Sequence, residues 1–134
     1  MNKRGVKYMF RKETIKESVS ALQLKPGDYC VITGTALVMH GIKEETKDID
    51  ISCTKEAFHT LAAQGYPIKQ GAFARKVIYS DDVEIFEDWH RGDITMIDEV
   101  PVASLESVIV MKKQLGREKD WIDIAKIEAH LAEQ

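Results

Sequence analysis

The stretch TKDIDI, residues 46–51, decides the expected fold, because acidic and apolar side chains alternate along it. Side chains alternate faces along a β-strand, so Asp48 and Asp50 point to one face while the intervening isoleucines point into a core. Two acids about 6–7 Å apart along one strand face repel each other unless a cation lies between them. The stretch therefore predicts a buried strand with a site for a hard divalent metal ion, which would in turn hold a phosphate chain.

A second motif, GTAL at residues 34–37, follows the apolar run YCVIT at residues 29–33. A glycine lets the backbone approach a phosphate closely, and the N–H groups that open the following helix are free donors. Thr35 adds a hydroxyl donor. Alone, Gly34 and Thr35 fit an ordinary helix start with a small residue for packing, and that interpretation stays open.

A third acidic residue, Glu84, lies in the apolar stretch VEIF at residues 83–86. A two-metal phosphoryl-transfer site needs such a carboxylate on a neighbouring strand. Asp82 and Glu87 compete for this role, but Asp82 falls in a predicted turn. Glu87 faces away from Glu84, because side chains alternate faces along a strand and the two residues are three positions apart. The alternative is the polar face of an edge strand.

The C-terminal third combines Lys112, in a mostly apolar helix, with Arg117 and Lys119 just before Asp120 and Asp123. The two aspartates share a helix face at i, i+3. An ordinary salt-bridge network between two terminal helices would explain this pattern. A cationic wall facing a triphosphate would explain it as well.

The composition, 134 residues with 44% hydrophobic and 31% charged, is typical of a soluble globular protein. A formal net charge of -3 excludes a general electrostatic attraction to nucleic acid or acidic membranes. Cys30 and Cys53 show neither zinc-site spacing nor a disulfide framework, and the four histidines show no metal spacing. Walker, Rossmann and Gly-x-Ser-x-Gly patterns are absent. No apolar run approaches ~18 residues, so we expect a cytoplasmic protein with no membrane partner.

We expect one mixed α/β (α+β) domain over residues 1–134, a small mixed β-sheet with flanking helices. Residues 1–11 are basic and are expected to form an N-terminal arm or a short edge strand. Periodicity and turn residues predict helices at 13–24, 36–40, 54–63, 104–115 and 118–131, and strands at 29–33, 49–53, 73–79, 83–86 and 94–102.

Together these motifs resemble the nucleotidyltransferase superfamily of the DNA polymerase β type, nearest its small bacterial and archaeal branch related to the AbiEii abortive-infection toxins. That branch reads Gly-(Gly/Ser/Thr)-x-x-Leu, then (Arg/Lys)-x-Thr-x-Asp-φ-Asp-φ with φ apolar. A third acid follows on a later strand, and Lys-x4-Arg-x-Lys-Asp-x-x-Asp lies near the C-terminus. Here those are residues 34–37, residues 46–51, Glu84 and residues 112–123. The resemblance covers roughly residues 29–131.

The resemblance implies that Asp48 and Asp50 bind a catalytic Mg²⁺, with Mn²⁺ as the alternative ion. Glu84 would be the third metal ligand or the base that acts on the acceptor hydroxyl. Lys112 would belong both to the catalytic group and to the nucleotide site.

The resemblance also implies that Gly34 and Thr35 hold the β/γ-phosphates, with Lys47, Lys112 and Asp123 around the nucleotide. Two positions depart from the branch. Thr35 stands where a second Gly or Ser is usual, and Glu44 stands where Arg is frequent.

The implied activity is transfer of a nucleoside monophosphate from an NTP to an acceptor hydroxyl, with tRNA, protein and small molecules as acceptor candidates. The alternative is a catalytically inactive partner protein of the same fold, an antitoxin or a scaffold. A cognate antitoxin or other partner protein is then also expected. A metal-dependent phosphodiesterase is a third hypothesis.

Overall fold

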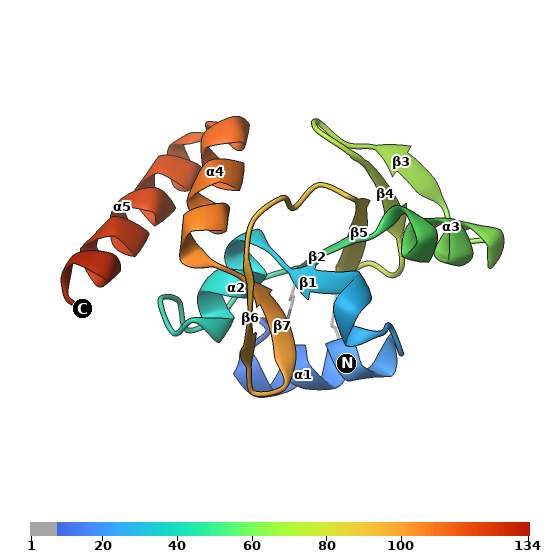
Figure 1. Ribbon diagram of the computed structural model, residues 1–134, viewed down its shortest axis with the longest axis horizontal. Coiled ribbons are helices and arrows are strands. Elements are labelled where there is room, and N and C mark those ends of the chain that lie inside the picture. Colours follow the sequence, from blue (N-terminus) through green and yellow to red (C-terminus); the bar gives the residue numbers. More distant parts are fainter. Residues whose placement is uncertain (1–7) are drawn as a thin grey trace.

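The computed structural model describes residues 8–134, in which helices alternate with strands up to α3, five strands then follow one another, and two helices end the chain (Figure 1). In chain order the elements are α1 (Lys12–Ala21), a 3₁₀ helix (Pro26–Asp28), β1 (Tyr29–Val31), α2 (Thr33–Met39), β2 (Ile49–Cys53), α3 (Lys55–Ala63), β3 (Ile68–Gln70), β4 (Arg75–Ile78), β5 (Val83–Glu87), β6 (Ile94–Ile97), β7 (Val100–Ala103), α4 (Leu105–Leu115) and α5 (Glu118–Ala132). No helix in this part of the chain combines the length and the apolar character needed to cross a membrane.

Within residues 8–134 the seven strands form one mixed sheet in the order β3-β4-β5-β2-β1-β7-β6. The strand β2 pairs antiparallel with β1 and parallel with β5, and β1 pairs parallel with β7. Antiparallel hairpins form both ends of the sheet, β3–β4 on one side and β6–β7 on the other. The predicted fold class, a small mixed sheet with flanking helices, is therefore confirmed.

The helices surround the sheet in separate groups (Figure 1). The last two, α4 and α5, lie side by side at the left of the view, while α3 lies beside β4 and β5 at the right. The isoleucines of β2 are fully buried, as their alternation with the aspartates predicts. Other fully buried large side chains come from α1, α2, α3, β5 and α5: Ile15, Leu37, Phe58, Ile85 and Ile127.

Several predicted element ends are confirmed by their caps. Thr54 opens α3, since its hydroxyl accepts a hydrogen bond from the Ala57 amide at 3.2 Å. Ser104 opens α4 in the same way, with the Ser107 amide at 3.1 Å. Gly116 ends α4 at φ 62°, a left-handed conformation that glycine adopts without a Cβ penalty.

Two predictions at the N-terminal end of the chain need correction. The helix predicted over residues 13–24 ends at Ala21, because Gln23 takes a left-handed conformation with φ 58°. The predicted arm, residues 1–11, falls partly outside the described residues. Within them, Phe10 forms an isolated antiparallel bridge with Thr46, so this segment reaches the loop that leads into β2.

The strand predictions need correction at three further places. The strand predicted over residues 29–33 stops at Val31, because Thr33 has φ 49° and begins α2. The strand predicted over residues 94–102 is two strands, β6 and β7, because Asp98 and Glu99 form a tight turn. The three-residue edge strand β3 was not predicted, since all of its residues are exposed and carry no apolar alternation.

The β6–β7 turn provides a stability test, because Asp98 and Glu99 have φ 51° and 68° without being glycine. Replacing Asp98→Asn together with Glu99→Gly supplies the residue types that such a two-residue turn favours. We expect the free energy of unfolding to rise by about 1 kcal/mol, the usual cost of a left-handed conformation for a residue with a Cβ. Urea denaturation monitored by circular dichroism measures it.

The double variant also removes an exposed ion pair between Glu99 and Lys16 at 3.1 Å. Lys16→Met removes the same pair without changing the turn, and should shift the unfolding free energy by less than about 0.5 kcal/mol. A double variant no more stable than the natural chain would contradict the strain argument.

Candidate functional site

A cleft of about 400 Å³ opens at the beginning of β2, between the loop that precedes this strand and the α4–α5 junction. The site residues expected from the sequence that line it are Gly34, Lys47, Asp48, Asp50, Lys112 and Asp123. The other two, Thr35 and Glu84, are not part of its lining. The cleft thus brings together residues that are far apart in the sequence.

Asp50 and Glu84 lie on the same face of the sheet, because they are direct partners in the parallel β2–β5 ladder. Asp48 precedes β2, which begins at Ile49, so Asp48 is a loop residue rather than the strand residue expected from the sequence. Glu84 forms an ion pair with Lys76 of the neighbouring strand β4, Nζ to Oε1 at 3.0 Å. The three acids therefore gather around one end of β2.

Two threonines at the start of α2 hold the acidic segment in place. The Thr33 hydroxyl donates to Oδ2 of Asp50 at 3.0 Å. The Thr35 hydroxyl donates to the carbonyl oxygen of Asp48 at 3.0 Å and accepts from the amide of Asp50 at 2.9 Å. Thr35 is 1% exposed and makes both of these bonds with its hydroxyl, so its side chain braces the acidic segment.

Gly34 lies at the cleft and has a steric reason to lack a side chain. A Cβ at this position would lie 3.1 Å from Oγ1 of Thr46, closer than ordinary van der Waals contact. The loop before β2 therefore packs directly on the backbone that opens α2.

Asp50 is half-buried, and its carboxylate lies near other negative charges. Burial raises the pKa of Asp50 from its ordinary value of 3.8 to about 6, against the hydrogen bond from Thr33, which lowers it. The charges of Glu84 and Asp48 raise it further. A carboxylate in this environment gains stability from any cation that approaches it.

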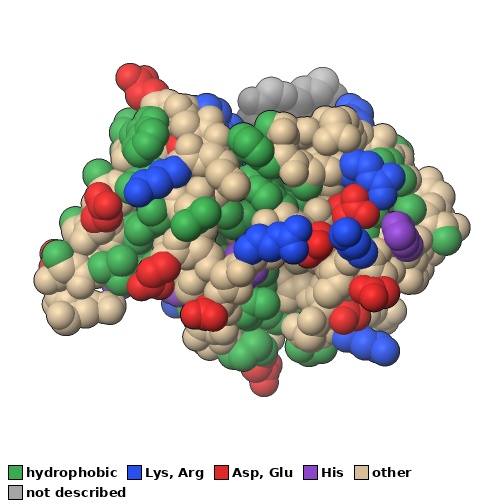
Figure 2. Space-filling model, turned by 45° about the horizontal axis from the view of Figure 1, so that its top comes forward, with side chains coloured by type: hydrophobic (Ala, Val, Ile, Leu, Met, Phe, Trp, Pro, Cys, Tyr) green, Lys and Arg blue, Asp and Glu red, His purple; other side chains and the backbone are tan. Residues whose placement is uncertain are grey.

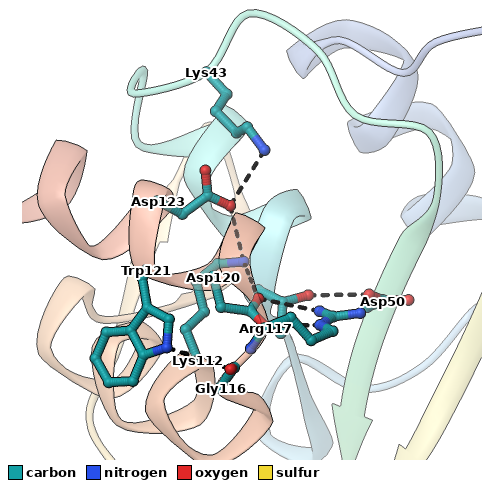
Figure 3. Close-up of polar contacts among 9 residues, drawn as sticks. Lys43, Asp50, Lys112, Gly116, Arg117, Asp120, Trp121 and Asp123 are labelled. Carbon is teal, nitrogen blue, oxygen red and sulfur yellow. Dashed lines mark hydrogen bonds and ion pairs between the residues drawn. The ribbon is translucent and has the colours of Figure 1, made fainter.

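Opposite the acids, a network of ion pairs joins α4 to α5 (Figure 3). Nζ of Lys112 lies 2.9 Å from Oδ2 of Asp123 and 3.3 Å from Oδ1 of Asp120. Arg117 binds Asp120 with Nε at 2.6 Å from Oδ2, and Lys43 reaches Asp123 at 3.3 Å. Lys112 is 4% exposed, so it lies inside the interface between the helices.

The network affects the titration of its fully buried member, Asp120. Burial alone would raise the pKa of Asp120, but hydrogen bonds from Arg117 and the charge of Lys112 outweigh it and lower the pKa to about 2.

The two explanations offered for the C-terminal charges are compatible with each other. The salt-bridge network exists, and Lys112, Arg117 and Lys119 also line the cleft.

The sequence did not point to three residues that matter here: Thr33, Lys43 and Lys76. Thr33 stands beside the glycine motif, and its hydroxyl could have been noted with that of Thr35. Lys43 lies in the loop before β2 and Lys76 in the partly buried strand β4, and neither position carries a pattern. Their roles depend on which strands and helices are neighbours.

The donor set fits a hard divalent ion that phosphate oxygens help to bind. Asp48 and Asp50 both line the cleft and offer carboxylate oxygens, the ligands that Mg²⁺ prefers. Among residues 8–134, no group of three His, Cys, Asp or Glu side chains is arranged to hold a metal alone. Mg²⁺ usually binds through one or two carboxylates together with substrate phosphates, and this arrangement suits that mode.

The comparisons with known proteins give one structural likeness. No protein-family model and no curated protein matches the chain. The crystal structure of "a putative nucleotidyltransferase" from Thermotoga maritima matches with a TM-score of 0.58, over 95% of this chain and 98% of that chain. The two sequences are 15% identical, so the likeness concerns the fold, which is similar to a nucleotidyltransferase fold.

The raised pKa of Asp50 predicts how metal-free protein responds to pH. The folded-state pKa, about 6, lies above the unfolded value, so the folded chain holds an extra proton between about pH 4 and 6. Stability is therefore lost as the pH rises through this range. Asp50→Asn should stabilise the protein by up to about 3 kcal/mol at pH 7.5 and by almost nothing below pH 4.

Urea denaturation in EDTA at several pH values measures this difference. Asp81→Asn, in an exposed turn, is the matched control and should show almost no difference at any pH. A stabilisation by Asp50→Asn that did not depend on pH would contradict the proposed burial of charge.

The buried position of Lys112 predicts a structural cost for its removal. Lys112→Met should destabilise the fold by about 3 kcal/mol. This value is at the lower end of the range for breaking a buried ion pair, because Asp120 and Asp123 each keep a second cationic partner. Lys43→Met removes a half-buried partner and should cost less than about 1 kcal/mol. Equal losses for the two variants in urea denaturation would contradict the buried network.

Proposed function

We propose that this protein is a metal-dependent nucleotidyltransferase, which transfers a nucleoside monophosphate from an NTP to an acceptor hydroxyl. The observation that carries the proposal is that carboxylates and cationic side chains line one cleft. Asp48 and Asp50 lie at the β2 end, and cationic side chains come from the α4–α5 junction and the loop before β2: Lys43, Lys47, Lys112, Arg117 and Lys119. A metal bound to a triphosphate needs both kinds of surface, carboxylates for the ion and cations for the phosphates.

The cations differ in how freely they can reach a phosphate. Lys47 and Lys119 are exposed and line the cleft, so they can contact the terminal phosphates directly. Arg117 is half exposed and faces Asp50 across the cleft (Figure 3). Lys112 is buried and paired, so its contribution is the positive field that it adds to the wall of the cleft.

The chemistry follows from these positions. A Mg²⁺ ion held by Asp48 and Asp50 would polarise the phosphate chain and offset its charge. The acceptor oxygen forms a bond to the α-phosphorus while the bond from that phosphorus to the bridging oxygen breaks, and pyrophosphate leaves. The proton of the acceptor hydroxyl would pass to a carboxylate of this cluster, and Glu84, beside Asp50 on the next strand, is the candidate that the resemblance implies. The cationic wall stabilises the negative charge of the departing pyrophosphate.

The Thermotoga protein supports the proposal through its fold and its name. Nucleotidyltransferase folds generally use divalent metals and NTP substrates, which agrees with the charges of this cleft. The toxin-like branch rests only on the sequence motifs. Screening α-³²P-labelled NTPs against tRNA, protein and small-molecule acceptors identifies the acceptor.

A second candidate is a partner protein without catalytic activity, an antitoxin or a scaffold. The observation that favours it is the apolar surface of the last two helices, where Val110, Trp121 and Ile122 are 58%, 50% and 53% exposed. Figure 2 shows hydrophobic side chains among charged ones over this region, at the left. Metal-dependent NTP binding separates the two, because a scaffold needs neither ligand.

Removing the charges of Asp48 and Asp50 tests the proposed function. Asp48→Asn with Asp50→Asn should abolish Mn²⁺-dependent binding of α-³²P-labelled NTPs, because asparagine lacks the charge that holds the ion. Equilibrium dialysis with an equimolar mixture of the four NTPs, with and without Mn²⁺, measures the binding. In the natural chain, Mn²⁺ should strengthen NTP binding at least tenfold.

The matched control is Glu13→Gln with Glu17→Gln, which neutralises two exposed acids of α1 that do not line the cleft. This control should bind NTPs like the natural chain. Full NTP binding by the aspartate variant, or none by the natural chain, would refute the nucleotidyltransferase proposal in favour of the partner protein.

A further inference from the structure

Thr33 has a backbone conformation that is unusual for its residue type. Its φ is 49°, in the left-handed region, which a β-branched residue seldom adopts. Thr33 is also 6% exposed. The other non-glycine residues of the described part of the chain with a positive φ are neither β-branched nor buried: Gln23, Asp88, Asp98 and Glu99. Such a conformation persists only where the surrounding structure holds it, so the contacts of Thr33 show what it does.

The left-handed turn at Thr33 wraps the start of α2 around Asp50. The Ile32 amide donates to the carbonyl oxygen of Asp50 at 3.0 Å, and the Thr33 hydroxyl donates to its Oδ2 at 3.0 Å. The Asp50 amide in turn donates to the hydroxyl of Thr35 at 2.9 Å. Ile32 and Thr35 therefore hold the backbone of Asp50, while Thr33 holds its carboxylate.

The backbone alone does not account for a threonine at position 33. Glycine adopts a φ of 49° without strain, but it would leave Oδ2 of Asp50 without this hydroxyl donor. Thr33 lines the cleft together with Asp48 and Asp50, where the proposed function places the divalent cation. A carboxylate has two oxygens, so a hydrogen bond to one of them fixes the direction of the other.

From this geometry, and resting on the proposed function, we infer that Thr33 is a positioning residue for the divalent cation. Its hydroxyl holds Oδ2 of Asp50 and leaves Oδ1 for the ion. Thr33 is not itself a ligand, and it acts only through Asp50. The strained turn brings the hydroxyl within reach of the carboxylate, so the chain keeps the strain in return for an oriented metal ligand.

Three substitutions at position 33 separate the hydroxyl from the side-chain shape and from the backbone strain. Thr33→Val keeps the β-branched shape and loses the hydroxyl, whereas Thr33→Ser keeps the hydroxyl. Thr33→Gly loses the hydroxyl but fits the left-handed backbone. Equilibrium dialysis at a fixed concentration of inorganic tripolyphosphate measures the affinity for Mn²⁺ without any assay of activity.

We expect Thr33→Val and Thr33→Gly to bind Mn²⁺ at least tenfold more weakly than the natural chain. Loss of a group that orients a metal ligand typically lowers metal affinity by about 10–100-fold. Thr33→Ser should bind Mn²⁺ within about twofold of the natural chain, because its hydroxyl can still donate to Asp50.

Gln23→Gly is the matched control. Gln23 has φ 58°, is exposed, and does not line the cleft, so its replacement relieves the same kind of strain without touching Asp50. Its Mn²⁺ affinity should equal that of the natural chain. Urea denaturation of every variant shows which of them are folded under the conditions of the dialysis.

The outcomes separate this inference from the proposed function. A folded Thr33→Val or Thr33→Gly that binds Mn²⁺ as tightly as the natural chain would overturn the inference and leave the proposed function intact. A tenfold loss in Thr33→Ser would also overturn it, because the buried methyl group would then be responsible. No Mn²⁺ binding by the natural chain would refute the proposed function, and the inference with it. If Thr33→Val does not fold, the difference between Thr33→Gly and Thr33→Ser decides.

Discussion

The close approach of negative charges at the start of β2 is the constraint on which the rest of the structure depends. The β2–β5 ladder fixes Asp50 opposite Glu84, and a strand cannot turn one of these side chains away without moving its isoleucines out of the core. The hydrophobic core therefore holds the acids together despite their repulsion. Hydrogen bonds from Thr33 and Thr35 stabilise this segment, but they do not neutralise its charge.

The compensating charges come from two directions. Lys76 lies on the sheet itself and pairs with Glu84, whereas Arg117 comes from the α4–α5 junction. The junction is itself fixed by the buried pairs of Lys112 with Asp120 and Asp123. A buried ion pair of this kind adds little net stability compared with an apolar contact, but it fixes which charged groups face the cleft.

Much of the fold could be predicted from the sequence because its signals were local. The alternation around Asp50, the threonine cap of α3 and the glycine that ends α4 depend on a few neighbouring residues. What depended on distant contacts was missed. The hydrogen bonds that the Thr35 hydroxyl makes with the backbone of Asp48 and Asp50 had no local sequence signal. Lys76 had no pattern, because only the strand order puts it beside Glu84.

The same reasoning explains why one residue type has different roles in this cleft. Lys112 and Lys47 both line it, yet Lys112 is 4% exposed with two carboxylate partners, whereas Lys47 is exposed. A buried, paired lysine fixes the two helices relative to each other. If it moved away, Asp120 and Asp123 would each lose a cationic partner inside the protein, where charge is poorly solvated. An exposed lysine can follow a ligand at little cost. The cleft therefore combines a charged frame that is fixed by burial with exposed cations, and in the proposed function both would act on the phosphate chain.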